Sequence, residues 1–165
     1  MRSPAVYRRL LTVPILFAAL IAANFSTSSG EAAHAAPVVQ KGKIARALDV
    51  ARHQKGEPYV YGADGPGSFD CSGLVQYSYG KAGIRVPRVS SDQARYFHRL
   101  KSKKNMKPGD LMAFYSGGGV YHVGLWTGRW QNGRRLIIHA SRSGTPVKVD
   151  PVWTRSWFGA TLRHR

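Results

Sequence analysis

The chain has 165 residues but only one cysteine, Cys71, and only 8 acidic side chains against 25 lysines and arginines. A single cysteine has no partner within the chain, so a disulfide framework is excluded. The scarcity of Asp and Glu leaves a formal net charge of +17, which governs partners and solubility rather than fold. The sequence also lacks internal repeats and low-complexity linkers after about residue 42. This predicts one domain with a single core of modest size and no second module.

The N-terminus has the features of an export signal. A basic start (Arg2, Arg8 and Arg9) precedes an apolar run from residue 10 to 25, and Ala33-His34-Ala35 fits an A-x-A cleavage site. We therefore expect residues 1–35 to be a cleaved signal peptide, 36–41 a short mature tail, and 42–165 the domain of a secreted protein. An uncleaved membrane anchor is the alternative. Without residues 1–35 the chain keeps 22 basic and 7 acidic side chains, a net charge of +15.

Export narrows what this positive charge can bind. A strongly basic chain usually suggests nucleic acid, but an exported bacterial protein meets the anionic polymers of the cell wall and the membrane surface. The sequence therefore predicts anionic cell-wall polymers as partners, bound through the basic surface, and no nucleic acid. A candidate contact patch is the lysine cluster Lys101, Lys103, Lys104 and Lys107. The alternative is that these lysines lie in a solvated loop with no binding role.

Hydrophobic spacing divides the chain into helices followed by strands. Helices are predicted from about residue 44 to 53, from 71 to about 81, and from 90 to about 100, the last opened by a capping box at residues 90–93. Strands are predicted at 111–115, 120–127, 136–140, 147–149 and 160–163, with turns at 117–119 and 132–133. Helices before strands predict an α+β fold, with N-terminal helices packed on a five- to six-stranded antiparallel sheet.

Cys71 falls at the predicted start of a helix, directly after Asp70, which has the character of an N-cap. Unpaired backbone N–H groups and the positive end of the helix dipole favour a thiolate there. Cys71 is therefore a candidate nucleophile, and the alternative is a free cysteine that serves as a small apolar side chain. Its backbone N–H and the hydroxyl of Tyr59 are candidate donors of an oxyanion hole, although Tyr59 also suits a role in the core.

A cysteine nucleophile needs a base, and His122 and His139 both lie in strands that are otherwise apolar. Strand alternation places the two on one face of the sheet. A two-residue turn at 132–133 would pair Trp126 with His139 and separate the histidines by about 13 Å. A longer loop over about 128–133 would set His122 opposite His139, as a catalytic pair requires. The other mature histidines, His53, His98 and His164, are expected at the surface.

Zinc is the competing use of one cysteine and two histidines. The sequence contains no close ligand pair such as C-x-x-C or H-x-x-x-H, and no acidic partner is evident. It therefore predicts no metal and no other cofactor.

Six segments share an order and spacing that are typical of one family. They are Pro58-Tyr-Val-Tyr-Gly62, Phe69-Asp-Cys-Ser-Gly-Leu-Val75, Pro87-Arg-Val-Ser-Ser-Asp-Gln93, Lys107-Pro-Gly-Asp-Leu111, His122-Val-Gly124 and Ile138-His-Ala140. Over about 120 residues the chain resembles the NlpC family of cell-wall cysteine peptidases. The resemblance implies a compact papain-like α+β fold.

The same resemblance implies roles for individual residues. Cys71 would be the nucleophile, His122 the general base and acid, and His139 the residue that orients His122. The substrate would be a peptidoglycan stem peptide, cleaved between D-glutamate and the diamino acid, with Asp70 and Ser72 helping to bind its free amine.

Two departures from the family pattern lie outside this catalytic set. Tyr61 and Gly62-Ala63 replace a common tryptophan and a pair of glycines, and the loop after His122 is longer and contains Trp130.

Together with this resemblance, the sequence predicts a secreted, monomeric thiol protease, which the resemblance implies to be a peptidoglycan D,L-endopeptidase acting through a Cys71 acyl-enzyme. An amidase or acyltransferase built on the same residues is one alternative, because fold does not fix chemistry. A non-catalytic cell-wall-binding module is the other.

Overall fold

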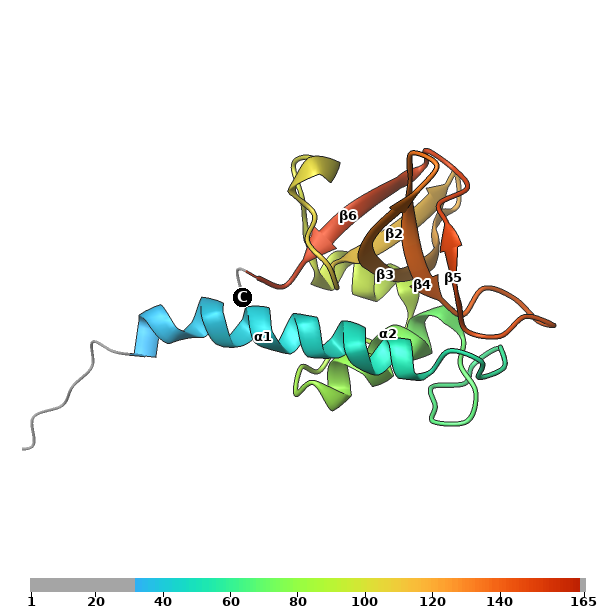
Figure 1. Ribbon diagram of the computed structural model, residues 1–165, viewed down its shortest axis with the longest axis horizontal. Helices are drawn as coiled ribbons and strands as arrows, with labels where there is room; N and C mark the ends of the chain where they lie inside the picture. The colour runs from blue at the N-terminus through green and yellow to red at the C-terminus, as the bar shows by residue number, and fades with distance from the viewer. Residues whose placement is uncertain (1–31, 164–165) are drawn as a thin grey trace, which may run out of the picture.

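The computed structural model describes residues 32–163, and within this range helices precede strands, as predicted (Figure 1). The predicted signal peptide, residues 1–35, lies largely outside this range, as does His164, so cleavage and export stay predictions. No helix among the described residues is long and apolar enough to cross a membrane. The elements are α1 (Ala32–His53), α2 (Cys71–Lys81), α3 (Ser90–Tyr96), β1 (His98–Arg99), the 3-10 helix η1 (Lys103–Asn105), β2 (Leu111–Ser116), β3 (Gly119–Gln131), β4 (Arg134–His139), β5 (Lys148–Pro151) and β6 (Trp157–Thr161).

The strands form one antiparallel sheet in the order β1-β6-β2-β3-β4-β5. Helices α1 and α2 lie on one side of it (Figure 1). The larger core lies between helices and sheet and includes Leu48, Leu74, Tyr79, Leu125 and Ile138. A smaller cluster covers the other face and includes Met112, Phe114, Trp126, Ile137 and Trp157. The predicted α+β fold is confirmed.

Helix α2 forms where the sequence places it because both of its ends are capped. The Asp70 carboxylate accepts a hydrogen bond from the Gly73 backbone N–H at 2.7 Å, satisfying one of the free donors of the first turn. Gly83, with φ of +80°, ends the helix in the left-handed conformation that glycine adopts without strain. Tyr79 is fully buried and donates its hydroxyl to the carbonyl of Gly109 at 2.8 Å.

The first and third helices differ from prediction. The backbone of α1 is already helical at Ala32, so the segment 36–41, expected as a tail, belongs to the helix. Helix α3 ends at Tyr96 because residues 98–99 pair with β6 instead. The predicted capping box is wrong, since α3 has Val89 at its N-cap without a side-chain cap. Gln93 instead donates to the carbonyls of Ser72 and Pro87, both at 2.8 Å, and thus holds α3 against the start of α2.

The β3–β4 hairpin follows neither predicted register. A two-residue turn at Asn132-Gly133 (φ +48° and +71°) joins the strands, with Gln131 paired to Arg134, a geometry that favours Asn-Gly. A bulge between Trp126 and Trp130 then shifts the pairing, so that Trp126 faces Ile137 and not His139. Continuing this register sets Gly124 opposite His139 and leaves His122 on the diagonal.

Candidate active site

The two strand histidines contact each other across this diagonal. Nε2 of His122 lies 2.8 Å from Nδ1 of His139, and the ring planes are inclined at 74° with centroids 5.0 Å apart. The exposed fractions of the side chains are only 6% and 1%. Residues diagonal in an antiparallel pair are about 7–8 Å apart at their backbones, within reach of aromatic side chains. The bulge therefore brings together two rings that a regular tight hairpin would separate.

A carboxylate that the sequence did not reveal completes this pair. Oδ2 of Asp150 lies 3.0 Å from Nε2 of His139, and it also accepts from Lys148 Nζ at 3.1 Å. Strand β5 pairs Lys148 with His139 and Asp150 with Ile137, so both side chains share the face of the histidines. The only signal in the sequence was that Asp150 follows a predicted strand. This position does not indicate which residue of the neighbouring strand Asp150 would lie beside.

The hydrogen-bond chain fixes which nitrogen of each ring carries a proton. Burial acts to raise the pKa of Asp150, but hydrogen bonds from His139 and Lys148 outweigh it and lower that pKa, so the carboxylate is ionised. It accepts from His139 Nε2–H, and the other nitrogen of neutral His139, Nδ1, then accepts from His122 Nε2–H. Nδ1 of His122 is left as the unprotonated nitrogen.

Both imidazoles are held in the neutral form. Burial, and then repulsion from His139, lowers the pKa of His122 to about 3. Burial also lowers the pKa of His139, although the hydrogen bond and charge of Asp150 act in the opposite direction. Desolvation dominates because an imidazolium loses its hydration in this site. At neutral pH His122 is therefore a base without a proton on Nδ1.

Cys71, the first residue of α2, lines a cavity of about 510 Å³ together with both histidines, Asp150 and Tyr59. The backbone N–H of Val123, the neighbour of His122 on β3, forms a hydrogen bond to the Cys71 thiol group. The helix start thus meets the sheet next to the histidine pair. The structure brings together the three predicted catalytic residues, which come from one helix and two strands.

The helix N-terminus favours the Cys71 thiolate, but it does not by itself bring the pKa of this thiol below its ordinary value. Burial raises the pKa of the Cys71 thiol, and the charge of Asp70 raises it further. Hydrogen bonds from the backbone N–H groups of Val123, Ser72 and Cys71 act in the opposite direction but do not compensate. The sulfur keeps its proton at neutral pH, so its reaction depends on a base.

Asp70 and Ser72 belong to a network on the other side of the sulfur. Arg88 donates to Asp70 Oδ1 and Oδ2 at 2.9 and 2.6 Å and to the Ser72 hydroxyl at 2.9 Å. Asp70 also accepts from Ser72 Oγ and from the backbone N–H of Gly62, both at 3.0 Å, in addition to capping Gly73. A carboxylate offers about four lone-pair sites, so these donors saturate Asp70.

Arg88 is thus a site residue that sequence reasoning missed, although it stands inside a quoted motif. Burial acts to raise the pKa of Asp70, but the hydrogen bonds and charge of Arg88 help to hold it below its usual value. Asp70, Ser72 and Arg88 line a cavity of about 450 Å³ that adjoins Cys71 and Tyr59. The charged network therefore shapes one side of the groove around the sulfur.

Tyr59 lies between these two cavities and lines both. Burial raises the pKa of its hydroxyl, and the charges of Cys71 and Asp70 raise it further. The hydroxyl is therefore protonated and can donate a hydrogen bond toward the space beside the sulfur. Its role at an oxyanion stays a prediction.

The structure also shows where two of the remaining histidines lie, and it bears on the zinc alternative. His53 and His98 are exposed, as predicted, and His53 Nδ1 lies 2.8 Å from the Asp49 carbonyl oxygen. Among the side chains that the structure describes, residues 41–163, no three His, Cys, Asp or Glu are grouped in a way that would hold a metal ion.

The sequence profile of the NlpC/P60 family matches residues 56–165, more than half of the chain. The chain belongs to the NlpC/P60 family. The match begins after α1 and includes every residue of the site described above.

The chain is similar to a curated probable endopeptidase and to a peptidoglycan hydrolase of known structure. A probable endopeptidase of Corynebacterium glutamicum is 40% identical over 116 residues, which are 70% of this chain and 51% of the relative. The chain thus spans about half the length of the first curated relatives it matches. The structure of the peptidoglycan hydrolase RipB of Mycobacterium tuberculosis has a TM-score of 0.62 at 31% identity, covering 76% of this chain and 67% of that one.

A second solved NlpC/P60 structure shows that the fold alone does not establish catalysis. RipD of Mycobacterium tuberculosis, described as a non-catalytic protein adapted to peptidoglycan binding, shares the fold with a TM-score of 0.60 at 24% identity. It covers 73% of this chain and 97% of that one. Catalysis has to be argued from the side chains of the present site.

One expected departure from the NlpC/P60 pattern takes a different form in the structure. The segment after His122 was expected to be a long loop containing Trp130. Strand β3 instead continues to Gln131, and Trp130 pairs with Arg135 on β4. The extra length extends the hairpin.

Proposed function

We propose that this NlpC/P60 protein is a secreted cysteine endopeptidase that hydrolyses peptidoglycan stem peptides at the bond between D-glutamate and the diamino acid. The observation that carries the proposal is the hydrogen-bonded chain from Asp150 through His139 to His122, which ends in the cavity that Cys71 lines. A buried, oriented and neutral imidazole beside a lone thiol is the arrangement that nucleophilic catalysis on an amide needs.

In the proposed reaction, Nδ1 of His122 takes the thiol proton as Cys71 Sγ attacks the carbonyl carbon of the scissile amide. The tetrahedral intermediate collapses when His122 returns this proton to the nitrogen of the diamino acid, which leaves as a free amine. A thioester to the D-glutamyl group remains. Water, deprotonated by His122, hydrolyses the thioester, and the proton goes back to the sulfur. His139 and Asp150 keep His122 in the required tautomer.

The negative charge that develops on the carbonyl oxygen needs donors that are already in place. The backbone N–H of Cys71, in the first turn of α2, is free of intrahelical partners, and the protonated hydroxyl of Tyr59 is the second candidate. The saturated Asp70 holds Ser72 and Arg88 in position. We include recognition of the stem-peptide amine on this side in the proposal, because Ser72 and Tyr59 line that cavity together with Cys71.

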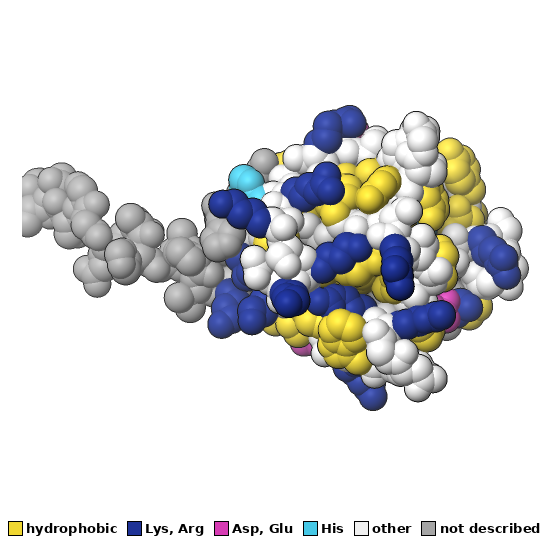
Figure 2. Space-filling model, turned by 90° about the horizontal axis from the view of Figure 1, so that it is seen from above, with side chains coloured by type: hydrophobic (Ala, Val, Ile, Leu, Met, Phe, Trp, Pro, Cys, Tyr) yellow, Lys and Arg dark blue, Asp and Glu magenta, His cyan; other side chains and the backbone are white. Residues whose placement is uncertain are grey.

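The basic surface supports a role at the cell wall. Figure 2 shows Lys and Arg side chains spread over the face seen from above, with hydrophobic side chains between them and few acidic ones. We propose that this surface holds the monomeric enzyme on anionic wall polymers. Exposed charges are screened over about 8 Å at physiological ionic strength, so binding to purified walls should weaken as salt is raised.

The decisive experiment incubates the protein and its Cys71→Ala variant with purified peptidoglycan and identifies the soluble products by mass spectrometry. Ser143→Ala, in an exposed loop, is the matched control. Fragments ending in D-glutamate, with new free amines on the diamino acid, are expected from the wild type and the control but not from Cys71→Ala. Transfer of the acyl group to another acceptor would indicate the acyltransferase alternative. No fragments from any form, with retained wall binding, would favour a binding module.

A further inference from the structure

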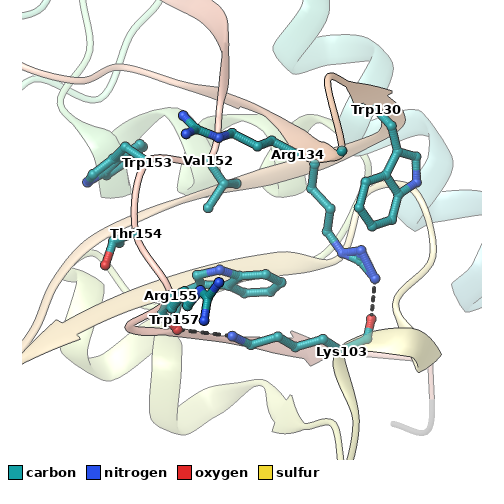
Figure 3. A pocket seen from close by; sticks show the side chains of 10 residues that line it. Lys103, Trp130, Arg134, Val152, Trp153, Thr154, Arg155 and Trp157 are labelled. Carbon is teal, nitrogen blue, oxygen red and sulfur yellow. Dashed lines mark hydrogen bonds between the residues drawn. The ribbon is translucent and has the colours of Figure 1, made fainter.

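A second cavity, of about 530 Å³, lies beside the catalytic one, and the two share only Trp153 among their lining residues. Figure 3 shows Trp130 and Trp153 at opposite sides of it, with Trp157 between them. Four cationic side chains also line it: Lys103, Arg134, Arg135 and Arg155. We name this cavity, lined by the three tryptophans and the four cations, the tryptophan–arginine pocket.

Among the described residues, the cations of the pocket have no anionic partners. No Asp or Glu lines the cavity, and within residues 32–163 none of the four cations takes part in an ion pair. Burial lowers the pKa of Lys103, and the nearby charges of Arg135 and Arg155 lower it further. Like charges held together without a counter-charge create a positive potential in a concave site, which attracts anions.

Arg135 is the buried member of this group. Its exposed fraction is 8%, and its guanidinium lies 4.3 Å from the ring centroid of Trp130 and 4.9 Å from that of Trp126. One terminal nitrogen donates to the carbonyl of Lys103 at 2.7 Å, a bond drawn as a dashed line in Figure 3. The Nε atom is buried without a partner among the described residues. Buried donors in folded proteins are nearly always paired, so the Nε–H of Arg135 lacks an acceptor among the described residues.

The tryptophans give the pocket a second chemical character. The side chains of Trp130 and Trp153 are 56% and 47% exposed, unusual for residues of this size. Lys103 Nζ lies 4.1 Å from the ring centroid of Trp157 and donates to the carbonyl of Arg155 at 3.0 Å. Indole faces carry negative charge density and pack against the C–H surfaces of sugars and polyols. Rings and cations therefore alternate around one concave site.

We propose that the tryptophan–arginine pocket binds a phosphodiester-linked sugar or polyol polymer attached to the cell wall. Phosphate suits the guanidinium groups because their planar forks bind its oxygens in pairs, and the indoles suit the sugar or polyol between phosphates. The inference rests on the proposed function, since the shared Trp153 wall would keep a bound polymer next to the stem peptide. A concave pocket also fits a single strand better than the flat surface of a bilayer.

The test measures binding of soluble poly(glycerol phosphate) by isothermal titration calorimetry, in a Cys71→Ala background so that catalysis plays no part. The double variant Arg134→Gln/Arg155→Gln removes two exposed charges from the pocket. Its matched control, Lys41→Gln/Arg46→Gln, removes the same charge from exposed positions on α1. We expect the dissociation constant to rise at least about tenfold for the pocket variant, as the loss of charge-assisted contacts implies, and less than about twofold for the control. Equal losses would overturn the proposal, because they would indicate net charge alone.

Trp130→Ala, at an exposed position, tests the aromatic part of the site, and we expect it to weaken binding about fivefold or more while thermal unfolding stays unchanged. Unchanged binding would contradict a stacking role. Two further probes separate the sources of phosphate: vesicles containing phosphatidylglycerol and an oligothymidylate. Binding of either with an affinity equal to or above that of the soluble polymer would overturn the assignment to a wall polymer.

Failure of this proposal and failure of the proposed function can be distinguished. Hydrolysis of a small soluble stem peptide by Arg134→Gln/Arg155→Gln, with Cys71 intact, is expected to equal that of the wild type. If hydrolysis persists and the polymer does not bind, only the pocket assignment falls. If the polymer binds and the peptide is not cut, only the endopeptidase proposal falls.

Discussion

The indole of Trp153 stacks on the imidazole of His139, with ring centroids 5.5 Å apart and planes inclined at 27°. Its other neighbours are Phe114, stacked at 4.4 Å, and His122, at 5.6 Å. The half-exposed indole thus covers the histidine pair from the solvent side. Because desolvation is the leading cause of the low pKa of His122, this cover helps to keep the proposed catalytic base neutral.

Asp150→Asn should lower kcat by about two orders of magnitude with little change in KM, because groups that orient a catalytic or metal-bound imidazole carry effects of this size. The amide keeps the shape of the side chain but no longer holds His139 in the tautomer that leaves Nδ1 of His122 free. Steady-state kinetics on a soluble stem peptide measure the effect. Lys148→Gln, which removes only the other contact to this carboxylate, is the control. A kcat within threefold of wild type would remove Asp150 from the mechanism.

The pH dependence of activity should reflect a Cys71 thiol and a His122 imidazole that are both uncharged at neutral pH. A base stops working when it is protonated, so a pKa of His122 lowered to about 3 extends activity to the acid side. We expect the acid limb of kcat/KM below about pH 5, well under the ordinary histidine value of about 6.5. The raised pKa of Cys71 predicts slow alkylation by iodoacetamide at pH 7 that accelerates only above about pH 9. An acid limb near 6.5, or fast alkylation at neutral pH, would contradict this assignment.

Two glycines of α2 should respond to alanine with opposite signs. A Cβ on Gly73 would lie 2.1 Å from the backbone oxygen of Ala63, so Gly73→Ala must displace the loop beside Cys71, at a cost of about 2 kcal/mol or more. Gly80 has open space around its Cα, and alanine there favours the helix by about 0.5–1 kcal/mol. Chemical denaturation of both variants measures the free energies of unfolding. Equal effects at both positions would show that helix propensity, and not the close approach of Ala63, decides the outcome.

Arg88→Gln should destabilise the protein by about 2 kcal/mol at pH 7, since it leaves the Asp70 carboxylate, 7% exposed, without its charged partner. The control is Arg95→Gln, which breaks an exposed ion pair with Asp92 and should cost less than about 0.5 kcal/mol.

The Arg88 effect also has a definite pH dependence. Because the pKa of Asp70 is lowered in the folded state, its contribution is fully present above the ordinary carboxyl value of about 3.9 and is lost as pH falls through the folded pKa. The difference between wild type and Arg88→Gln should therefore shrink below about pH 4. A difference that is constant from pH 7 to 3 would place the effect in packing and not in charge.

Local chemistry made part of the site predictable. The N-cap at Asp70 and the glycine that ends α2 are decided within a few residues, so the position of Cys71 at a helix start could be predicted from neighbouring letters alone. The same holds for the Asn132-Gly133 turn. The state of the thiol was not predictable in this way, because burial against β3 outweighs the helix N-terminus and depends on the packed tertiary structure.

The register of the strand pairs was the second feature that the sequence could not predict. A bulge between Trp126 and Trp130 shifts the position of His122 relative to His139 by two residues. No local sequence pattern predicts this bulge. Asp150 was missed for a related reason, since its approach to His139 depends on the β4–β5 register. Arg88 stands within a motif quoted from the sequence. Its pairing with Asp70 was missed because the two residues are 18 positions apart in the chain.

The proposed nucleophile and its proposed base come from different layers of the fold, Cys71 from helix α2 and His122 from the sheet. Neither the helical half nor the strand half of the chain holds a working site. A chain that crossed the membrane before folding would carry its reactive groups apart from one another, in a harmless state. Its destructive chemistry would begin only where the two halves dock, so that folding itself sets the time and place of activation.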